Sequence, residues 1–198
     1  MYPKTIKELI EFFSKLPGIG EKTAERLSFY MMNYEKDEID KAIETINNIK
    51  NIKKCKNCNN LTEEELCYIC NDKERDSNIL CIVEDVKNLI MFEKIGSFKG
   101  KYHVLEKLIS PLNAIGPEDL NIEKIKERIN KEKIKEVIIA LKSTIEGETT
   151  ALYLNKILDK EKIIISKIAQ GVPLGTDMEY LDPITLETAI SNRKKISE

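Results

Sequence analysis

Four cysteines, spaced as two Cys-x-x-Cys pairs, place the tightest constraint on how this chain folds. The pairs are Cys55 with Cys58 and Cys67 with Cys70, separated by residues 59–66. Each pair puts two thiolates on one side of a tight turn, and two facing turns form the tetrahedral sulfur site that Zn²⁺ prefers. Two short disulfides or a redox-active pair are the alternatives, although two redox motifs so close together would be unusual. The spacing favours one structural zinc ion, because four thiolates leave no position for a catalytic water.

Composition and charge limit the classes of function that are open to the chain. Its 198 residues suffice for one large domain or two small ones, and 41% hydrophobic with 33% charged residues is typical of a water-soluble globular protein. A net charge of -2 provides no global field for nucleic acid, so such binding has to come from local groups. No apolar run approaches the roughly 18 residues of a membrane helix, and the N-terminus lacks a signal-peptide layout. We therefore expect a cytoplasmic protein with no membrane partner.

The chain before the cysteines has the periodicity of three short helices. Apolar residues recur at helical spacing in segments 5–15, 21–32 and 38–50. Thr5 and Glu8 have the spacing of a capping box, which predicts that the first helix begins there. We expect a small helical unit that ends at the cysteines.

After Cys70, short β-branched or apolar runs alternate with segments of helical spacing. Four strands and three helices are expected: strands at 79–83, 102–105, 136–141 and 163–165, and helices at 86–94, 122–130 and 149–158. Such alternation predicts a parallel sheet with helices on its faces. Cys81 lies inside the first of these strands, where a buried structural thiol is expected.

The segment LPGIGEKTAERL, residues 16–27, has the form of a helix-hairpin-helix. Gly18 and Gly20 allow a turn too tight for a side chain, and the amides around them point outward at the start of the next helix. Exposed amides at a helix N-terminus bind a DNA phosphate without regard to sequence, and Lys22 and Arg26, four residues apart, add charge beside them. The alternative is an ordinary glycine-bearing turn between two packed helices.

Three glutamates follow strands of the predicted sheet. Glu84 comes after the first strand, and Glu146 and Glu148 come after the third, at the edge where ligands of open parallel sheets gather. Converging carboxylates would hold Mg²⁺ for phosphoryl transfer. Alternatively, Glu146 and Glu148 stabilise a helix N-terminus, where negative charge is favourable. Lys142 favours this second interpretation, because an ammonium at the end of that strand competes with a metal cation.

The segment QGVPLGTDMEYLD, residues 170–182, combines turn formers with a short apolar run. Its MEYLD end is similar to a strand that finishes in an aspartate, as in the metal-coordinating strand of nucleotide hydrolases. The chain has no GxxxxGK[ST] phosphate loop, so an ATPase is not expected.

Together these motifs resemble the RecR family of bacterial recombination mediators. The resemblance covers essentially the whole chain. It is carried, in the family's order, by LPGIGEKTAERL, the cysteine pairs, ILCIVE at 79–84, SPLNAIGPEDL at 110–120, IEGETTA at 145–151 and IAQGVPLGTDMEYLDPITL at 168–186.

The resemblance implies a multidomain α plus α/β fold in four parts. They are a helix-hairpin-helix unit at 1–53, a four-cysteine zinc finger at 54–77, a Toprim-type parallel-sheet α/β domain at 78–168, and a C-terminal Walker B-like segment with a helix at 169–198. It also implies DNA contacts at the hairpin, where the family's basic positions fall on Lys22 and Arg26.

Members of this family are not known as enzymes. They resemble clamps that assemble into dimers or ring-like tetramers and bind DNA, including single- and double-stranded, gapped and junction forms. The family acts with the RecO and RecF proteins and helps to load RecA on gapped single-stranded DNA. By resemblance we therefore expect a nucleoid-associated repair protein that forms a homodimer or homotetramer.

The acidic edge departs from the pattern of catalytic Toprim enzymes. Those enzymes join a glutamate after the first strand to an Asp-x-Asp-x-Asp pattern after the third. This chain keeps Glu84 but has Lys142, Thr144 and Glu146 at the three aspartate positions, and RecR relatives usually have Asn-Pro in place of Lys142 and Ser143. The three glutamates are thus expected to form a vestigial site or a partner site. A Mg²⁺-dependent Toprim nuclease or primase, and a sequence-specific zinc-finger regulator, are the competing hypotheses.

Overall fold

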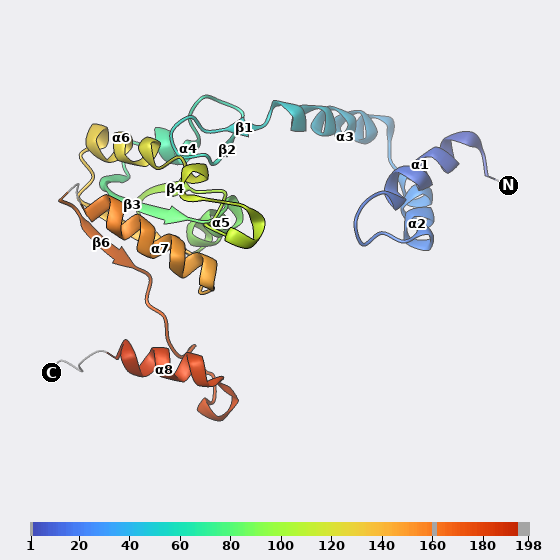
Figure 1. The fold of residues 1–198 in the computed structure, drawn as a ribbon. Helices are drawn as coiled ribbons and strands as arrows, with labels where there is room; N and C mark the ends of the chain where they lie inside the picture. The colour runs from blue at the N-terminus through green and yellow to red at the C-terminus, as the bar shows by residue number, and fades with distance from the viewer. Residues whose placement is uncertain (1, 160–161, 194–198) are drawn as a thin grey trace. The chain divides into compact units, whose positions relative to one another are not determined.

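The computed structural model describes residues 2–159 and 162–193 of the chain. Two compact units are distinguished, one up to Ile52 and one from Lys53 onward, and Figure 1 shows the elements of each. The first unit is helical and the second contains a parallel sheet, so the expected fold class is confirmed. In the part of the chain that is described, no helix is long and apolar enough to cross a membrane.

Within residues 2–52, the first unit contains three helices and a short 3-10 turn. They are α1 (Lys4–Ser14), α2 (Glu21–Met31), α3 (Lys36–Asn48) and η1 (Ile49–Asn51). The capping box expected at Thr5 and Glu8 is wrong, because α1 begins at Lys4, one residue before Thr5. The carbonyl of Pro3 accepts the amide of Lys7 there, which leaves Thr5 inside the helix.

The helices of the first unit bury little apolar surface. Ala24 on α2 is fully buried, whereas Ile43 and Ile46 on α3 remain 52% and 55% exposed. The predicted apolar face of α3 is therefore present, but it stays open within this unit. It lines an apolar groove of about 850 Å³ together with α1 and the end of α2.

The cysteine-bearing segment opens the second unit. It forms the short antiparallel strands β1 (Lys53–Lys54) and β2 (Leu61–Thr62), followed by the single-turn helix α4 (Tyr68–Asn71). This segment, residues 53–72, is called the zinc knuckle below.

The sheet of the second unit has four strands, all parallel, in the order β4-β3-β5-β6. Its strands are β3 (Asp76–Val83), β4 (Gly100–Val104), β5 (Glu136–Ala140) and β6 (Ile164–Lys167). The central strands β3 and β5 pair in register from Ile79 opposite Glu136 to Val83 opposite Ala140. The parallel sheet predicted from the alternation of segments is confirmed.

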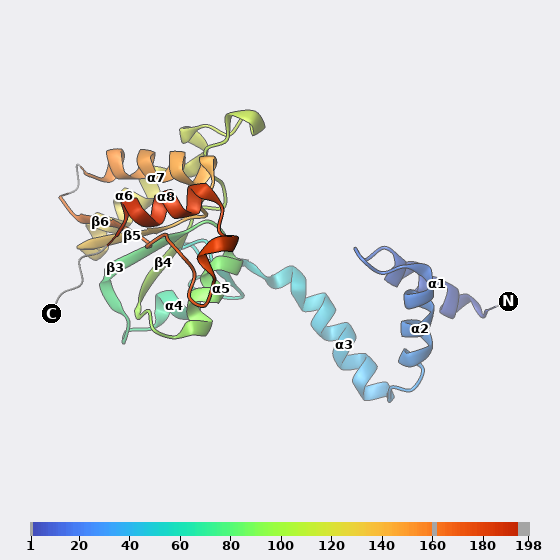
Figure 2. The same cartoon turned by 90° about the horizontal axis from the view of Figure 1, so that it is seen from below.

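Side chains of the central strands alternate between two cores. Leu80 and Ile82 of β3 face a core formed with helices α6 (Ile122–Glu132) and α7 (Ile145–Leu158). Cys81 and Val83 face a second core formed with helix α5 (Val86–Ile95) and the knuckle. Figure 2 shows α7 on one side of the sheet and α4 and α5 on the other. Cys81 is 3% exposed, so the prediction of a buried thiol is confirmed, and burial raises its pKa to about 12.

Helix α7 begins four residues before the predicted start at 149. The hydroxyl of Thr144 caps it by accepting the amide of Gly147 at 3.3 Å. A side chain at position 147 would collide with the backbone oxygen of Lys142, so glycine permits the close approach of α7 to the end of β5. The early start places Glu146 and Glu148 in the first turn of the helix.

The strand expected at MEYLD is wrong. Residues Met178–Tyr180 form a 3-10 turn, η5, and helix α8 spans Pro183–Ser191. Asp182 caps α8 by accepting the amide of Thr185 at 2.9 Å, a role that favours a helix start over a strand end. The last residues of the expected C-terminal segment, 194–198, lie outside the described residues.

Candidate metal centre and nucleic-acid interface

The four cysteines of the two pairs converge on one point. Their sulfur atoms all lie within 4.8 Å of one another, and Cys58 Sγ is 3.5 Å from Cys67 Sγ. A tetrahedral zinc site with Zn–S bonds of about 2.3 Å places its sulfurs about 3.8 Å apart, so the arrangement fits this metal. All four thiols are free, which does not support the disulfide alternative.

Backbone turns shape this sulfur cage. The amide of Cys55 donates to the carbonyl of Asn60 at 2.7 Å, and Asn59 takes a left-handed conformation, with φ 62°, to close the first turn. The amide of Cys67 donates to Cys55 Sγ at 3.3 Å, which favours a charged sulfur. The turns thus position the thiols and stabilise thiolates before a metal enters.

Contacts among the thiols shift the pKa values of Cys58 and Cys67 in opposite directions. Hydrogen bonds from Cys58 and Cys70 lower the pKa of Cys67, whereas hydrogen bonding to Cys67 and Cys70 and burial raise the pKa of Cys58. Zn²⁺ binding therefore has to displace protons from the remaining thiols, as for other thiolate sites.

The knuckle bonds to the outer side of β4, which is the edge strand of the sheet. The amide of Val104 donates to the carbonyl of Cys58 at 2.9 Å, and Asn59 Nδ2 donates to the carbonyl of Val104 at 2.8 Å. From helix α6, Lys124 Nζ donates to Asn59 Oδ1 at 2.6 Å. Because β4 ends the sheet, these bonds satisfy backbone groups that would otherwise be open to pairing with another chain.

A buried lysine on β4 donates hydrogen bonds to the C-terminal end of the knuckle. Lys101 on β4 is only 7% exposed, and its ammonium donates to the carbonyls of Ile69 at 2.9 Å, Cys70 at 3.4 Å and Asp72 at 2.5 Å. These carbonyls lie in and just after α4, where a helix end leaves acceptors without intrahelical partners. The charge of Lys101 therefore orients the turn that carries the fourth metal ligand.

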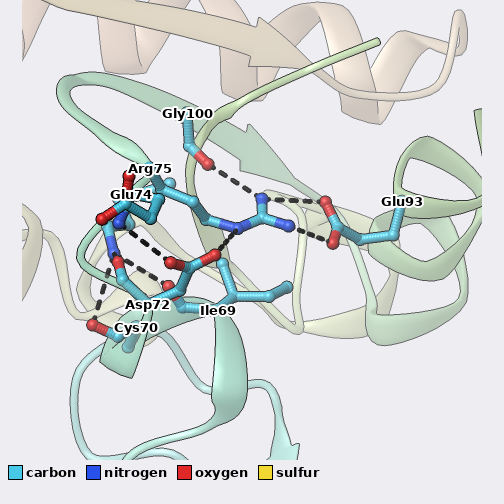
Figure 3. A network of polar contacts seen from close by, with 8 residues as sticks. Ile69, Cys70, Asp72, Glu74, Arg75, Glu93 and Gly100 are labelled. Atoms are coloured by element: carbon cyan, nitrogen blue, oxygen red, sulfur yellow. Dashed lines mark hydrogen bonds and ion pairs between the residues drawn. The ribbon is translucent and has the colours of Figure 1, made fainter. Parts of the chain in front are cut away.

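Arg75 completes this junction, as Figure 3 shows. Its guanidinium forms a bidentate ion pair with Glu93 of α5, in which Nη1 donates to Oε1 at 3.0 Å and Nη2 donates to Oε2 at 2.5 Å. Nη1 also donates to the carbonyl of Gly100 at 3.2 Å, and Nε lies 3.5 Å from a carboxylate oxygen of Asp72. Sequence reasoning missed both Lys101 and Arg75, because Glu93 and the carbonyls of α4 lie 18 or more positions away along the chain and no local pattern marks the contacts.

The hairpin between α1 and α2 leaves donors free. Gly18 takes φ 82°, a left-handed conformation that favours glycine, and Gly20 precedes the first turn of α2. The amides of Gly20, Glu21 and Lys22 have no hydrogen-bond acceptor within the described residues. Such a group of amides at a helix N-terminus is suited to an anion.

Lys22 and Arg26 are both on the surface of α2. Neither makes an ion pair or hydrogen bond with any residue that the structure describes. Their charges are therefore available to an external anion beside the hairpin amides. That they contact DNA remains a prediction.

At the carboxyl edge of the sheet, lysines pair with two of the three predicted acidic residues. Lys142 Nζ lies 2.8 Å from Glu84 Oε1, and Lys167 Nζ lies 2.6 Å from both carboxylate oxygens of Glu148. Within residues 2–159 and 162–193, the cysteines form the one group of metal-ligating side chains close enough to share an ion. The three glutamates are thus not brought together as a metal site.

The pKa shifts at this edge follow from the same contacts. The ammonium of Lys167 lowers the pKa of Glu148, and bonding to Glu84 raises the pKa of Lys142. The pKa of Glu146 is lowered by its own backbone amide and by the Thr144 hydroxyl, the donors at the start of α7. This is the behaviour expected of a carboxylate at a helix N-terminus.

The hairpin, the cysteine cage and the parallel sheet define a Toprim protein that carries a zinc finger and a helix-hairpin-helix. Residues 78–169 match the Toprim domain. Three further matches are to the RecR helix-hairpin-helix at 6–49, the RecR four-cysteine zinc finger domain at 52–72, and the RecR C-terminal region at 171–194.

Comparison with curated proteins gives the same family over the full length. The chain is 43% identical over 196 residues to Recombination protein RecR of Natranaerobius thermophilus, covering 98% of each. It is 42% identical to the proteins of that name from Staphylococcus saprophyticus and Staphylococcus haemolyticus, covering 98% of this chain and 99% of each relative. The chain belongs to the RecR family of recombination proteins. Its four clustered cysteines are those of the family's zinc finger, which can bind one metal ion.

Proposed function

We propose that this protein is a recombinational repair mediator that binds DNA through the hairpin of α1 and α2. The observation that carries the proposal is the pair of surface cations, Lys22 and Arg26, beside free amides at the start of α2. Phosphate contacts of this kind position a protein on DNA without reading its sequence. This favours a mediator over a sequence-specific zinc-finger regulator.

Assembly through both ends of the subunit would make these weak contacts effective. The open groove of the first unit supports such assembly, as do Leu174, Tyr180 and Ile184 of the C-terminal segment, which are 75% exposed or more. Several hairpins in a homodimer or homotetramer would engage one DNA molecule at once, which raises avidity without new contacts. The proposed domains are those implied by the family, at 1–53, 54–77, 78–168 and 169–198.

In this proposal the protein acts as a clamp with RecO and RecF and helps to load RecA on gapped single-stranded DNA, in the cytoplasm at the nucleoid. The acidic edge would serve as a vestigial or partner-binding surface. Ion pairing of Glu84 with Lys142 and of Glu148 with Lys167 supports this role over catalysis, because a divalent cation would have to displace both lysines.

The hairpin is tested with the double variant Lys22→Ala, Arg26→Ala in a mobility assay at several salt concentrations. Removing two phosphate-binding cations should weaken binding on all sequences alike and reduce the salt slope by about 2 for each engaged hairpin. The matched control is Lys36→Ala, Lys41→Ala, which removes the same charge from exposed positions on α3. Equal effects of the two double variants would show that only net charge matters and would remove the hairpin from the interface.

The enzyme hypothesis makes a separate prediction. A Toprim nuclease or primase would show Mg²⁺-dependent cleavage or synthesis that Glu84→Gln abolishes, whereas the proposed mediator shows neither activity. Metal-dependent turnover of DNA lost in this variant would therefore overturn the non-catalytic assignment.

A further inference from the structure

A buried arginine with one unused donor lies beside the zinc knuckle. Arg128 on α6 is 3% exposed. Its Nε donates to Glu132 Oε1 at 3.0 Å and its Nη1 donates to the carbonyl of Tyr102 at 2.6 Å. Its Nη2 is buried and has no hydrogen-bond partner among the residues described. A buried guanidinium donor is costly to leave unpaired, so an acceptor is expected within reach.

Cys70 lies at the wall of a cavity of about 280 Å³ that Arg128 also lines. Asn57 Nδ2 links Cys70 to the carboxylate that holds Arg128, because it donates to Glu132 Oε1 at 2.7 Å and to Cys70 Sγ at 3.8 Å.

Cys70 also differs from the other three cysteines in its surroundings. Cys55, Cys58 and Cys67 are at most 1% exposed, whereas Cys70 is partly exposed at the wall of the cavity. Four thiolates around one Zn²⁺ keep a net negative charge, and such sulfurs are stabilised by donors in the layer around the metal. Arg128 has an unpaired donor group at the same cavity, on the side of the cage where Cys70 lies.

We propose that Arg128 is a positioning residue of the metal centre, with Nη2 and the Asn57 amide donating to the zinc-bound Cys70 thiolate. Zinc affinity of the finger then depends on a side chain of helix α6, which belongs to the sheet domain. The ion pair with Glu132 and the bond to Tyr102 hold the guanidinium in the orientation that this requires. The knuckle and the sheet are coupled through the fourth ligand as well as through packing.

The test measures zinc affinity of the full-length protein by competition with a chromogenic chelator. Arg128→Gln should weaken zinc binding about 10- to 100-fold, the range found when outer-shell partners are removed. Lys131→Gln is the matched control, since it removes the same charge from an exposed position of the same helix. Its zinc affinity should stay close to that of the unsubstituted protein. Equal losses in the two variants would overturn the proposal.

A second measurement separates this role from simple structural support. Arg128→Gln is combined with Cys70→His or with Cys58→His, and zinc affinity is measured in each background. If Nη2 acts on the Cys70 sulfur, the penalty disappears in the Cys70→His background and persists in the Cys58→His background. The same penalty in both backgrounds would assign Arg128 to general packing. Arg128→Lys, which keeps the buried charge, provides the folded comparison if the glutamine variant is unstable, and it should bind zinc with intermediate affinity.

Discussion

Two regions of the molecule treat their charged and apolar side chains in opposite ways. One is the junction between the knuckle and the sheet, and the other is the helical unit of residues 2–52. At the junction, Lys101 and Arg75 are shielded from solvent and bonded to carbonyls and carboxylates of the same chain. In the helical unit, Ile43 and Ile46 stay more than half exposed, and the hairpin cations have no partner within the described residues. The first region is completed by its own chain, whereas the second presents groups that only another molecule can satisfy.

This contrast indicates where stability and where function are to be sought. A region with satisfied polar groups and a shared core fails mainly by unfolding when it is altered. A region with open apolar and charged surface fails by losing partners while it stays folded. Four substitutions test this distinction.

Loss of the metal centre should have the largest effect. Cys67→Ser removes one thiolate from a cage whose cysteines are part of the core beneath α5 and β4, so unfolding should become easier by more than about 4 kcal/mol. Thermal denaturation and zinc content measure it. Cys81→Ala, a core thiol outside the cage, should retain full zinc and lose only about 1 kcal/mol. A soluble Cys67→Ser protein with full zinc content and unchanged stability would contradict the assignment.

Removal of the buried ammonium should come next. Lys101→Met leaves three carbonyls at the end of α4 without their donor, which should destabilise the protein by about 2–3 kcal/mol. Denaturant titration followed by circular dichroism measures the change. Lys99→Met, two residues away and exposed, is the control and should change stability by less than about 0.5 kcal/mol. Equal behaviour of the two variants would show that the ammonium contributes nothing to the junction.

A charge on the open face of α3 should alter assembly more than folding. Ile43 is a half-exposed residue of the groove, so Ile43→Glu should lower the free energy of unfolding by only about 0.5 kcal/mol. Light scattering should instead report a smaller particle than for the unsubstituted protein, because the glutamate would be buried in the proposed contact between subunits. Glu44→Lys, on the neighbouring exposed position, is the control for a change of charge. Unchanged molar mass in the Ile43→Glu protein would exclude this face from assembly.

The smallest effect is expected at the acidic edge. Glu84→Gln breaks the ion pair with Lys142, whose side chain is 47% exposed, so any loss of stability should be smaller than that of Lys101→Met. A larger loss, seen in the same denaturant titration, would show that this edge belongs with the satisfied junction. Zinc content serves as the internal control and should not change.

Local pattern sufficed for much of the molecule. The cysteine spacing predicted the cage, because each Cys-x-x-Cys turn is a local structure with a narrow range of geometries. Strand and helix alternation predicted the parallel sheet, since a parallel pair needs a crossover of this length. The element boundaries followed less closely from pattern. Thr5 did not cap α1, and the start of α7 was missed although its cap is local, with the hydroxyl of Thr144 accepting the amide of Gly147 three residues on.

By itself, then, the sequence determined the metal-binding cage, the order of elements and the hairpin, all of which depend on residues close together in the chain. The tertiary structure decided what the carboxyl edge of the sheet contains. It paired Glu84 with Lys142, 58 positions away, and Glu148 with Lys167, which turned a hypothetical metal site into neutralised surface. It also brought Lys101 to the carbonyls of α4 and Arg128 to the cavity that Cys70 lines. Such pairs form only when the packed sheet brings distant segments together, and no periodicity in the sequence records them.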